Sequence, residues 1–337
     1  MFTSYALVAL CAVLSLPVNV AAAAAPTQMH EFSERAAYNK TYTLSKNIVG
    51  HKFYDNFHFF DRKDPTDGLV KYLSLKDARK WNLTSATKSV FTISGDSTET
   101  LAVGQGRKST RIESKWSIGN HVHILDLAQM PTGRGSWPAY WMVGPNWPNG
   151  GEIDIIEGAN DILPNLMTIH TTPNCTMQGI STRVQSGRIK AQDCNAFANG
   201  NVGCGVYGSK GNDFGPKLNS GNGGYFAFQR TDDEVNVWFF KRYTQGIPAD
   251  ILDPRRTSVN PATWGAPDAH WSSSNSCDLK AKLAKMKIVM NLTFCGGFGG
   301  HTFPLPGGTP GCEDFVRNNP QEFKDAMWKV YGLRIYE

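Results

Sequence analysis

Three acidic residues stand inside an apolar, β-branched stretch, Gly-Gly-Glu-Ile-Asp-Ile-Ile-Glu-Gly, at residues 150–158. The isoleucines favour a β-strand. Side chains alternate between the faces of a strand, so Glu152 and Asp154 share a face and Glu157 points the other way. A β-bulge between Asp154 and Glu157 would return Glu157 to that face. The Cα atoms of the two glutamates would then lie roughly 13 Å apart, and their side chains could lean toward each other.

Two such carboxyl groups could cleave a glycosidic bond. In a retaining glycosidase they lie roughly 5–5.5 Å apart, one attacking the anomeric carbon and the other protonating the leaving oxygen. The alternative interpretation is an edge strand whose carboxylates are solvated. Carboxylates are rarely buried without partners, so three of them in an apolar run favour the chemical interpretation.

The elements that would position this strand are short apolar stretches, which alternate with turn residues from Asn47 onward. Long helical periodicity is nearly absent, and short helices are expected only near 279–285 and 321–328. The spacing predicts an all-β, two-sheet sandwich. The expected strands include 90–94, 111–116, 121–127, 137–143, 166–171, 224–230, 235–242, 287–294 and 331–336.

The rest of the chain predicts one domain over residues 26–337. It contains no internal repeat and no linker rich in proline, serine and threonine. Residues 26–46 are expected to be an irregular lead-in. The long segment 173–223 is rich in glycine, asparagine and cysteine, which predicts a functional loop or one held by disulfides.

The N-terminus predicts secretion. The apolar run 6–16 is followed by Pro17 and by alanines at 21–25, which offer cleavage sites for a signal peptide spanning 1–25 and ending between 20 and 25. A spanning helix needs about 20 apolar residues, so no membrane attachment is expected after cleavage. The C-terminal residues do not form a hydrophobic tail, so a lipid anchor is not expected there. The net charge of +5 is spread along the chain, so nucleic acid is not indicated.

Cysteine usage agrees with an extracellular protein. Cys11 lies in the predicted signal, and an even number of further cysteines suggests disulfides. Cys194 and Cys204 close a short polar loop and are the expected pair, whereas the other pairings remain open. No Cys-x-x-Cys is present, so zinc is not expected. The cysteines expected to pair are Cys175, Cys194, Cys204, Cys277, Cys295 and Cys312.

Two further patterns concern glycosylation and metal binding. Glycosylation sequons occur at positions 39, 82, 174 and 291, of which the last lies in a strand-like run and is not expected to carry a glycan. His121 and His123 share one strand face near Asp126 and could ligate a metal. No third ligand is evident, and glycosidic cleavage needs no metal, so neither a metal nor a cofactor is expected.

The acidic pattern Glu-x-Asp-x-x-Glu, with Trp-Pro-x-x-Gly at 147–151 before it, resembles the signature of glycoside hydrolase family 16. It is similar to the bulged form found in laminarinase-type β-glucanases. The resemblance implies a concanavalin A-like β-jelly roll with a concave substrate cleft. Further segments that resemble fungal members are 53–57, 67–72, 130–133, 137–141, 168–171, 238–240, 247–250 and 291–296.

The resemblance implies roles for the three carboxyls: Glu152 is the nucleophile, Asp154 the helper and Glu157 the acid/base. As an anion, Asp154 is expected to hold Glu157 protonated. The implied protein is a monomeric, extracellular or cell-wall-associated endo-β-glucanase that cleaves β-1,3- or mixed β-1,3/1,4-glucans with retention. Two alternatives remain open: a β-glucan transglycosylase using the same residues, and a non-catalytic glucan-binding lectin.

Aromatic residues near the acidic strand are candidates for stacking on sugar rings. The family has a stacking tryptophan at the position of Trp147. Tyr140 and Trp141 point to opposite faces of their strand, and Tyr140 is expected to face the cleft. Trp137 could belong to the cleft or to the core.

The remaining candidates are polar residues and one departure from the family pattern. His170 is expected to hydrogen-bond Glu157 or the leaving sugar. Arg111 is either within reach of a sugar hydroxyl or an ordinary surface arginine. Fungal relatives typically carry Asp-Trp after Phe-Cys-Gly, where this chain has Gly297 and Phe298. The smaller ring and the lost acceptor put the preferred glucan in doubt.

Overall fold

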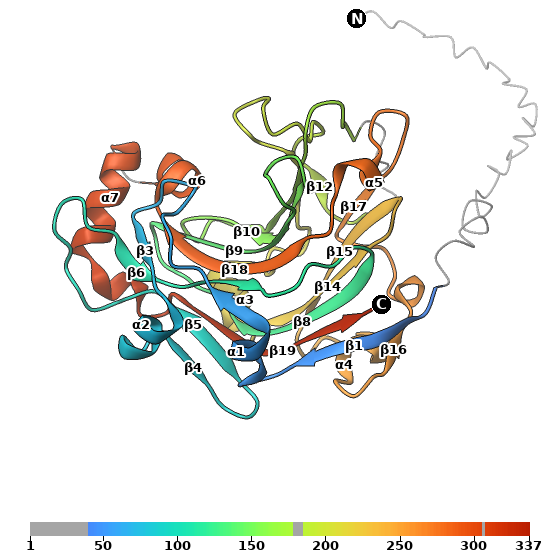
Figure 1. The fold of residues 1–337 in the computed structure, drawn as a ribbon, viewed down its shortest axis with the longest axis horizontal. Coiled ribbons are helices and arrows are strands. Elements are labelled where there is room, and N and C mark those ends of the chain that lie inside the picture. Colours follow the sequence, from blue (N-terminus) through green and yellow to red (C-terminus); the bar gives the residue numbers. More distant parts are fainter. Residues whose placement is uncertain (1–39, 178–184, 305–306) are drawn as a thin grey trace, which may run out of the picture. The chain divides into compact units, whose positions relative to one another are not determined.

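The computed structural model describes residues 40–177, 185–304 and 307–337. The predicted signal peptide and the sequon at position 39 lie outside these ranges. Two antiparallel sheets dominate the described chain (Figure 1), so the predicted all-β sandwich is confirmed. None of the helices described is long and apolar enough to cross a membrane.

The first sheet has nine strands. Its main order is β16-β1-β19-β8-β14-β15-β17, and β5 joins β4 to β19. Its strands are β1 (Tyr42–Ile48), β4 (Thr84–Ala86), β5 (Phe91–Ser94), β8 (His121–Gln129), β14 (Gly224–Arg230), β15 (Glu234–Lys241), β16 (Ser258–Val259), β17 (Ala269–Ser272) and β19 (Met327–Tyr336).

The second sheet has eight strands in the order β12-β13-β11-β10-β9-β18-β7-β2. In Figure 1 its central strands form an arc whose hollow side faces away from the nine-stranded sheet. Its strands are β2 (Phe57–Phe59), β7 (Arg111–Ser114), β9 (Ser136–Val143), β10 (Glu152–Glu157), β11 (Leu166–His170), β12 (Arg188–Ile189), β13 (Cys204–Tyr207) and β18 (Lys287–Phe294).

Short helices and one small parallel pair complete the described chain. Strands β3 (Val70–Tyr72) and β6 (Arg107–Ser109) form the parallel pair. The helices are α1 (Lys52–Asn56), α2 (Leu75–Lys80), α3 (Gly215–Ser220), α4 (Ala249–Leu252), α5 (Leu279–Lys282), α6 (Gly296–His301), α7 (Gly308–Asn318) and the 3₁₀ turns η2 (Pro261–Thr263) and η3 (Pro320–Phe323).

The main core lies between the two sheets. Ile153 of β10 and Phe226 and Phe228 of β14 are fully buried in one hydrophobic cluster. Strand alternation then sends the intervening residues to the outer faces. The outer face of the eight-stranded sheet is therefore the one that carries Glu152 and Asp154.

Three segments differ from the expectations. The segment 173–223 contains β12, β13 and α3, and β1 begins within the expected lead-in, at Tyr42. The helix expected at 321–328 is only a 3₁₀ turn, because β19 begins at Met327. Strand pairing with β5 and β8 overrides the weak helical pattern there.

Three disulfides join the six cysteines. Cys194–Cys204 is confirmed as a pair, and the other two bridges, which the sequence left open, are Cys175–Cys277 and Cys295–Cys312. The bridges differ in the length of chain that they close: 10 residues for Cys194–Cys204 and 102 for Cys175–Cys277.

We predict that removing the bridge that closes the longer loop destabilises the fold more. On the chain-entropy model, replacing Cys175 and Cys277 by alanine costs about 4.7 kcal/mol, and replacing Cys194 and Cys204 costs roughly 2–3 kcal/mol. Urea unfolding of the two double variants measures the difference. Equal losses, or a larger loss for the short loop, would contradict the prediction.

Candidate active site

A β-bulge interrupts the strand that carries the acidic residues. On one side β10 pairs Glu152 with His170 and Asp154 with Thr168, and the register then shifts before Glu157 pairs with Leu166. The pairing with β9 shifts at the same place. The predicted bulge between Asp154 and Glu157 is thus confirmed.

The bulge turns two consecutive isoleucines inward. Ile155 and Ile156 are both fully buried in the core between the sheets, which regular alternation would not allow. The following residue, Glu157, is partly exposed like Glu152. All three carboxyls therefore lie on the outer face of the eight-stranded sheet.

Asn165, which the sequence analysis did not single out, holds the backbone of the bulge. Its Oδ1 accepts a hydrogen bond from the Glu157 N–H (3.0 Å), and its Nδ2 donates to the Ile155 carbonyl (2.8 Å). The Asn165 N–H in turn donates to Asp213 Oδ1 (3.2 Å). The buried amide thus satisfies backbone groups that the bulge leaves without strand partners.

Trp137 and Trp147 each contact one glutamate. The Trp137 indole N–H donates to Oε1 of Glu157 (3.1 Å). Trp147 is 44% exposed and hydrogen-bonds Glu152. The structure therefore places Trp137 on the acidic face, and Trp147 presents an open indole surface beside Glu152.

The expectation for Tyr140 is wrong. Tyr140 is 1% exposed and belongs to the core between the sheets. Trp141 takes the outer face instead, opposite Asp154 in the register, and donates to Asn291 Oδ1 (2.7 Å). The β9 register decides this, because the residue opposite Asp154 shares its face.

Arg111 is neither an exposed surface residue nor a free donor. It is buried and pairs with Glu113 Oε1 (2.9 Å). Its guanidinium lies 5.1 Å from the Trp141 ring centroid and 4.5 Å from that of Phe60. Arg111 therefore lies over the Trp141 ring, and its charge favours the ionised form of Glu152.

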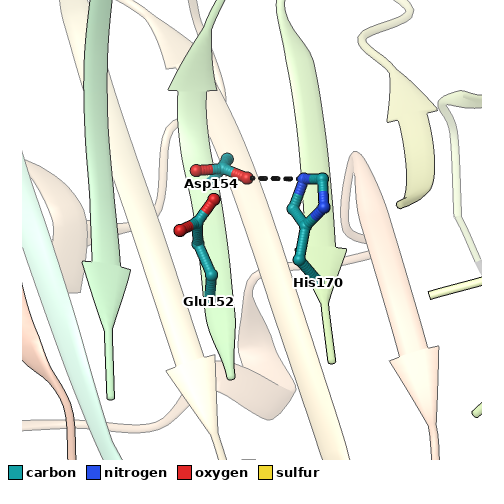
Figure 2. Close-up of side chains that lie close together, drawn as sticks. All are labelled: Glu152, Asp154 and His170. Atoms are coloured by element: carbon teal, nitrogen blue, oxygen red, sulfur yellow. Dashed lines mark ion pairs between the residues drawn. The ribbon is translucent and has the colours of Figure 1, made fainter. Parts of the chain in front are cut away.

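His170 contacts Asp154 rather than Glu157 (Figure 2). Its Nε2 lies 3.5 Å from Asp154 Oδ2, and its Nδ1 lies 2.9 Å from Asn201 Oδ1. Burial lowers the pKa of His170 to about 4. The imidazole is therefore neutral near neutral pH, and its contact with Asp154 does not join two full charges.

All three carboxyls of the site have raised pKa values. Burial raises the pKa of Glu152, Asp154 and Glu157, and mutual repulsion adds to it at Glu152 and Asp154. Trp147 and Arg111 oppose this rise at Glu152, as Trp137 does at Glu157.

The charge expected for Asp154 needs correction. Burial, and then the charges of Glu152 and Glu157, raise the pKa of Asp154 well above its ordinary value. Burial and repulsion therefore favour a protonated Asp154, rather than an anion that holds Glu157 protonated. Once it is neutral, Asp154 relieves the repulsion on the two glutamates.

Glu152, Asp154 and His170 are also close enough together to be considered as metal ligands, with one ligand atom of each within 4.8 Å of the others. Two of the three are carboxyls whose pKa values burial raises. Protonated carboxyls are poor ligands, and the chemistry of paired carboxyls needs no metal. His121 and His123 form a second candidate, but their rings are buried and hydrogen-bonded to each other (2.9 Å) in the nine-stranded sheet.

A lysine and a phenylalanine lie near the Glu157 side of the site. The Phe298 ring stands edge-on to Trp137 at 5.6 Å. The Lys190 ammonium, just after β12, lies 6.0 Å from the Phe298 centroid and 5.8 Å from that of Tyr207. The positive charge of Lys190 opposes the burial that raises the pKa of Glu157. The sequence analysis did not single out Lys190.

Two similar solved structures are glucan-active enzymes. The chain is 38% identical to laminarinase 16A of Phanerochaete chrysosporium, solved with β-glucans in donor and acceptor sites, with a TM-score of 0.84 over 88% of this chain and 100% of that one. It is 35% identical to an elongating family 16 β-1,3-glucosyltransferase, with a TM-score of 0.80 and the same coverage. The concanavalin A-like jelly-roll prediction is thereby confirmed.

Sequence relatives agree with this. A probable glycosidase of Schizosaccharomyces pombe is 38% identical over 88% of this chain and 70% of its own length. A probable endo-1,3(4)-β-glucanase of Aspergillus fumigatus is 36% identical over 90% of this chain. The chain spans about half the length of that and several other curated relatives.

The family model described as "XgeA-like, catalytic GH16 domain" matches residues 57–336. The chain belongs to glycoside hydrolase family 16, as its acidic signature predicted.

Proposed function

We propose that this protein is a secreted, retaining endo-β-glucanase that hydrolyses internal bonds of β-1,3-glucans or mixed β-1,3/1,4-glucans. The observation that carries the proposal is the bulge in β10, which puts Glu157 on the same face as Glu152. Two partly exposed glutamates on the outer face of a family 16 sheet are the apparatus of double displacement. The names of relatives support a β-glucan as the substrate.

In the first step Glu152 attacks the anomeric carbon while Glu157 protonates the leaving glycosidic oxygen, giving a covalent glycosyl-enzyme. In the second step Glu157 removes a proton from water, which displaces Glu152. Burial raises the pKa of both glutamates. Trp147 and Arg111 oppose the rise at Glu152, and Trp137 and Lys190 oppose it at Glu157. When Asp154 is protonated, it adds no negative charge between the two glutamates and so does not repel their ionised forms.

Secretion is part of the proposal. The three disulfides support it, because such bridges persist in oxidising compartments. Together with the apolar N-terminal run, they favour an extracellular enzyme that meets β-glucan outside the cell or in a cell wall.

Product analysis on laminarin and on mixed-linked glucan tests the proposal. We expect a ladder of short oligosaccharides from the start of the reaction, with newly formed ends in the β configuration by NMR. Release of glucose alone would contradict an endo mode of action, and initial α products would contradict retention. No turnover of either polymer would overturn the proposal.

Transglycosylation is the second candidate. It is favoured by the 35% identity and TM-score of 0.80 to an elongating β-1,3-glucosyltransferase. The same Glu152 intermediate would then be intercepted by a sugar rather than by water. Products longer than the donor, at high concentrations of laminari-oligosaccharides, would identify this activity.

Removing Lys190 is predicted to change the pH profile. Protonation of the leaving oxygen requires protonated Glu157, so activity falls as pH rises through the pKa of that residue. Lys190 lowers this pKa, and Lys190→Met should therefore move the alkaline limb of kcat/KM to higher pH. Lys190 is exposed, and screening limits the shift to roughly a few tenths of a pH unit.

Lys287→Met is the matched control for this experiment. Lys287 is on β18 of the same sheet, where its ammonium lies 3.5 Å from a Glu113 carboxylate oxygen. Its removal should leave the alkaline limb unchanged. An unmoved or lowered limb in Lys190→Met would show that Lys190 does not act on Glu157.

Asn165 is predicted to position Glu157 through the bulge. Asn165→Ala leaves two buried backbone groups without their partner, which should cost roughly 2–5 kcal/mol of stability. Displacing Glu157 should lower kcat on the order of 10- to 100-fold. Asn165→Asp keeps the acceptor for the Glu157 N–H but loses the donor to Ile155, so it should retain more activity than the alanine variant. Urea unfolding and initial rates give both quantities, and full activity in Asn165→Ala would contradict the role.

A further inference from the structure

A second group of aromatic residues lies on the opposite side of the sandwich from the acidic site. Phe226 and Val330 of the nine-stranded sheet point into the core between the sheets. Alternation therefore sends Tyr225 to the outer face of that sheet. The register of β19 shifts at Tyr331, whose ring lies on the same side as Tyr225 because both rings contact Arg242. Tyr331 is 42% exposed there.

Two adjoining cavities meet at the turn after β15, the larger on this outer face and the smaller beside the end of β15. Their volumes are ≈ 540 Å³ and ≈ 370 Å³, and they share Thr244, Gln245 and Ile247 in their walls. The larger cavity is also lined by Tyr225, Arg242, Tyr243, Leu252 and Tyr331. We call these two adjoining cavities the outer-face groove.

Arg242 fixes the aromatic wall of the outer-face groove. Its guanidinium lies 4.6 Å from the Tyr225 ring centroid and 5.2 Å from that of Tyr331. Its N–H groups donate to Tyr225 Oη (2.9 Å), to the carbonyls of Asn222 and Leu127, and to Asp126. The arginine is therefore occupied and neutralised within the fold, and it holds the rings in place rather than offering a site for an anion.

Tyr243 is placed in solvent by an unfavourable backbone. It is 82% exposed and has a φ of 62° in the turn that follows β15. The Thr244 N–H donates to the Lys241 carbonyl (3.3 Å), which puts Tyr243 at the third position of that turn. Glycine or asparagine suits a positive φ at this position best, and a bulky ring there is strained.

The contrast with other turns makes Tyr243 conspicuous. Among the non-glycine residues with positive φ in the described ranges, every other one is asparagine or aspartate except Cys295, which a disulfide holds. An exposed ring gains nothing from burial that would offset the strain. Strained residues of this kind cluster at positions where the side chain serves a function.

We propose that the outer-face groove is a second binding site for β-glucan, at which Tyr243 and Tyr331 stack on glucose rings. A pyranose presents flat C–H faces to aromatic rings and hydroxyls at its edge. The exposed side chains of Thr244 and Gln245 line the groove beside the tyrosines and offer donors and acceptors to those hydroxyls. The site rests on the proposed function only for the identity of the polymer.

A polymer explains why such a site would stand apart from the carboxyls. A chain or particle of glucan extends far beyond one active site, so a second contact holds the enzyme near uncut bonds by raising their effective concentration. A short oligosaccharide in the active site does not reach the opposite face of the sandwich. The outer-face groove should therefore matter for insoluble polymer and not for short substrates.

Tyr243→Asn is the decisive variant. Asparagine accepts the positive φ, so the fold should be as stable as before or more stable, and loss of binding could not be attributed to unfolding. In a Glu152→Gln background, which binds without cleaving, we expect the variant to bind particles of insoluble linear β-1,3-glucan about 3- to 10-fold more weakly. A contribution of roughly that size is typical of one aromatic contact. Tyr331→Thr should act in the same direction.

Tyr243→Trp is the control, because it keeps an aromatic face and should retain binding. In the active enzyme, Tyr243→Asn should leave kcat/KM on a soluble laminari-oligosaccharide unchanged and lower the rate on the insoluble glucan. Unchanged particle binding by Tyr243→Asn would overturn the second site. Absence of turnover of the soluble oligosaccharide by the unmodified enzyme would instead count against the proposed function, and the particle assay in the inactive background would still decide the site. If the groove instead captures a protein, the asparagine variant will bind glucan normally, which also overturns the inference.

Discussion

Replacing Glu152 by alanine is expected to lower kcat/KM on β-glucan by roughly 10⁴-fold or more. The substitution removes the group that attacks the anomeric carbon and leaves the acid in place, so little of the double displacement survives. The vacated space can accept a small anion. Added azide should attack the sugar directly from the side of Glu152 and give a glycosyl azide of inverted configuration.

The measurement is the initial rate on laminarin, followed by NMR of the azide product formed from an activated aryl glycoside. The unmodified enzyme, with azide present, is the control, and its rate should not rise. Urea unfolding of Glu152→Ala should show a stable fold, because removing a carboxyl whose pKa is raised by desolvation and repulsion relieves both. Near-normal hydrolysis by this variant would show that Glu152 is not the nucleophile.

The acidic strand could be predicted from the sequence because its chemistry conflicts with its surroundings. Three carboxyls in an isoleucine-rich run make sense only if one strand face is a site, and a spacing of five between Glu152 and Glu157 requires a bulge for both to reach that face. The structure has the bulge at that position. The sequence does not show what holds it, because Asn165 lies eight residues beyond Glu157 and acts through the backbone.

The register of a neighbouring strand was harder to predict. Tyr140 and Trp141 are adjacent aromatics of similar hydrophobicity. Alternation predicts that their side chains lie on opposite faces of the strand, but it does not predict which of the two lies on the outer face. The pairing of Asp154 with Trp141 decides the matter, and that pairing depends on contacts between strands. The partners of Cys175 and Cys295 were open for the same reason, since 102 and 17 residues separate them from the cysteines they join.

The charge state of Asp154 could not be predicted from the sequence either. Its position between the two glutamates is legible in the sequence, but its burial is not. In the structure it is 3% exposed, and the desolvation of a carboxylate outweighs its long contact with the neutral ring of His170. Spacing alone therefore suggested an anion where packing favours a proton.

Replacing Glu157 by alanine is expected to lower activity on β-glucan by roughly 10³-fold or more while sparing substrates that need no acid. The nucleophile remains, so an aryl glycoside with a good leaving group should still form the glycosyl-enzyme, which then accumulates because no base activates water. Azide needs no base and should release this intermediate.

Because azide displaces Glu152 in this variant, two inversions occur in sequence, and the glycosyl azide should have retained configuration. Glu152→Ala and Glu157→Ala should therefore give opposite azide anomers from the same aryl glycoside, with the rate of the Glu157 variant depending far more steeply on the leaving group. Structural damage to the fold would lower the rates of both variants, but it would not give glycosyl azides of opposite configuration. The same anomer from both, or normal glucan hydrolysis by Glu157→Ala, would show that the two glutamates flanking the bulge do not divide the reaction into attack and proton transfer.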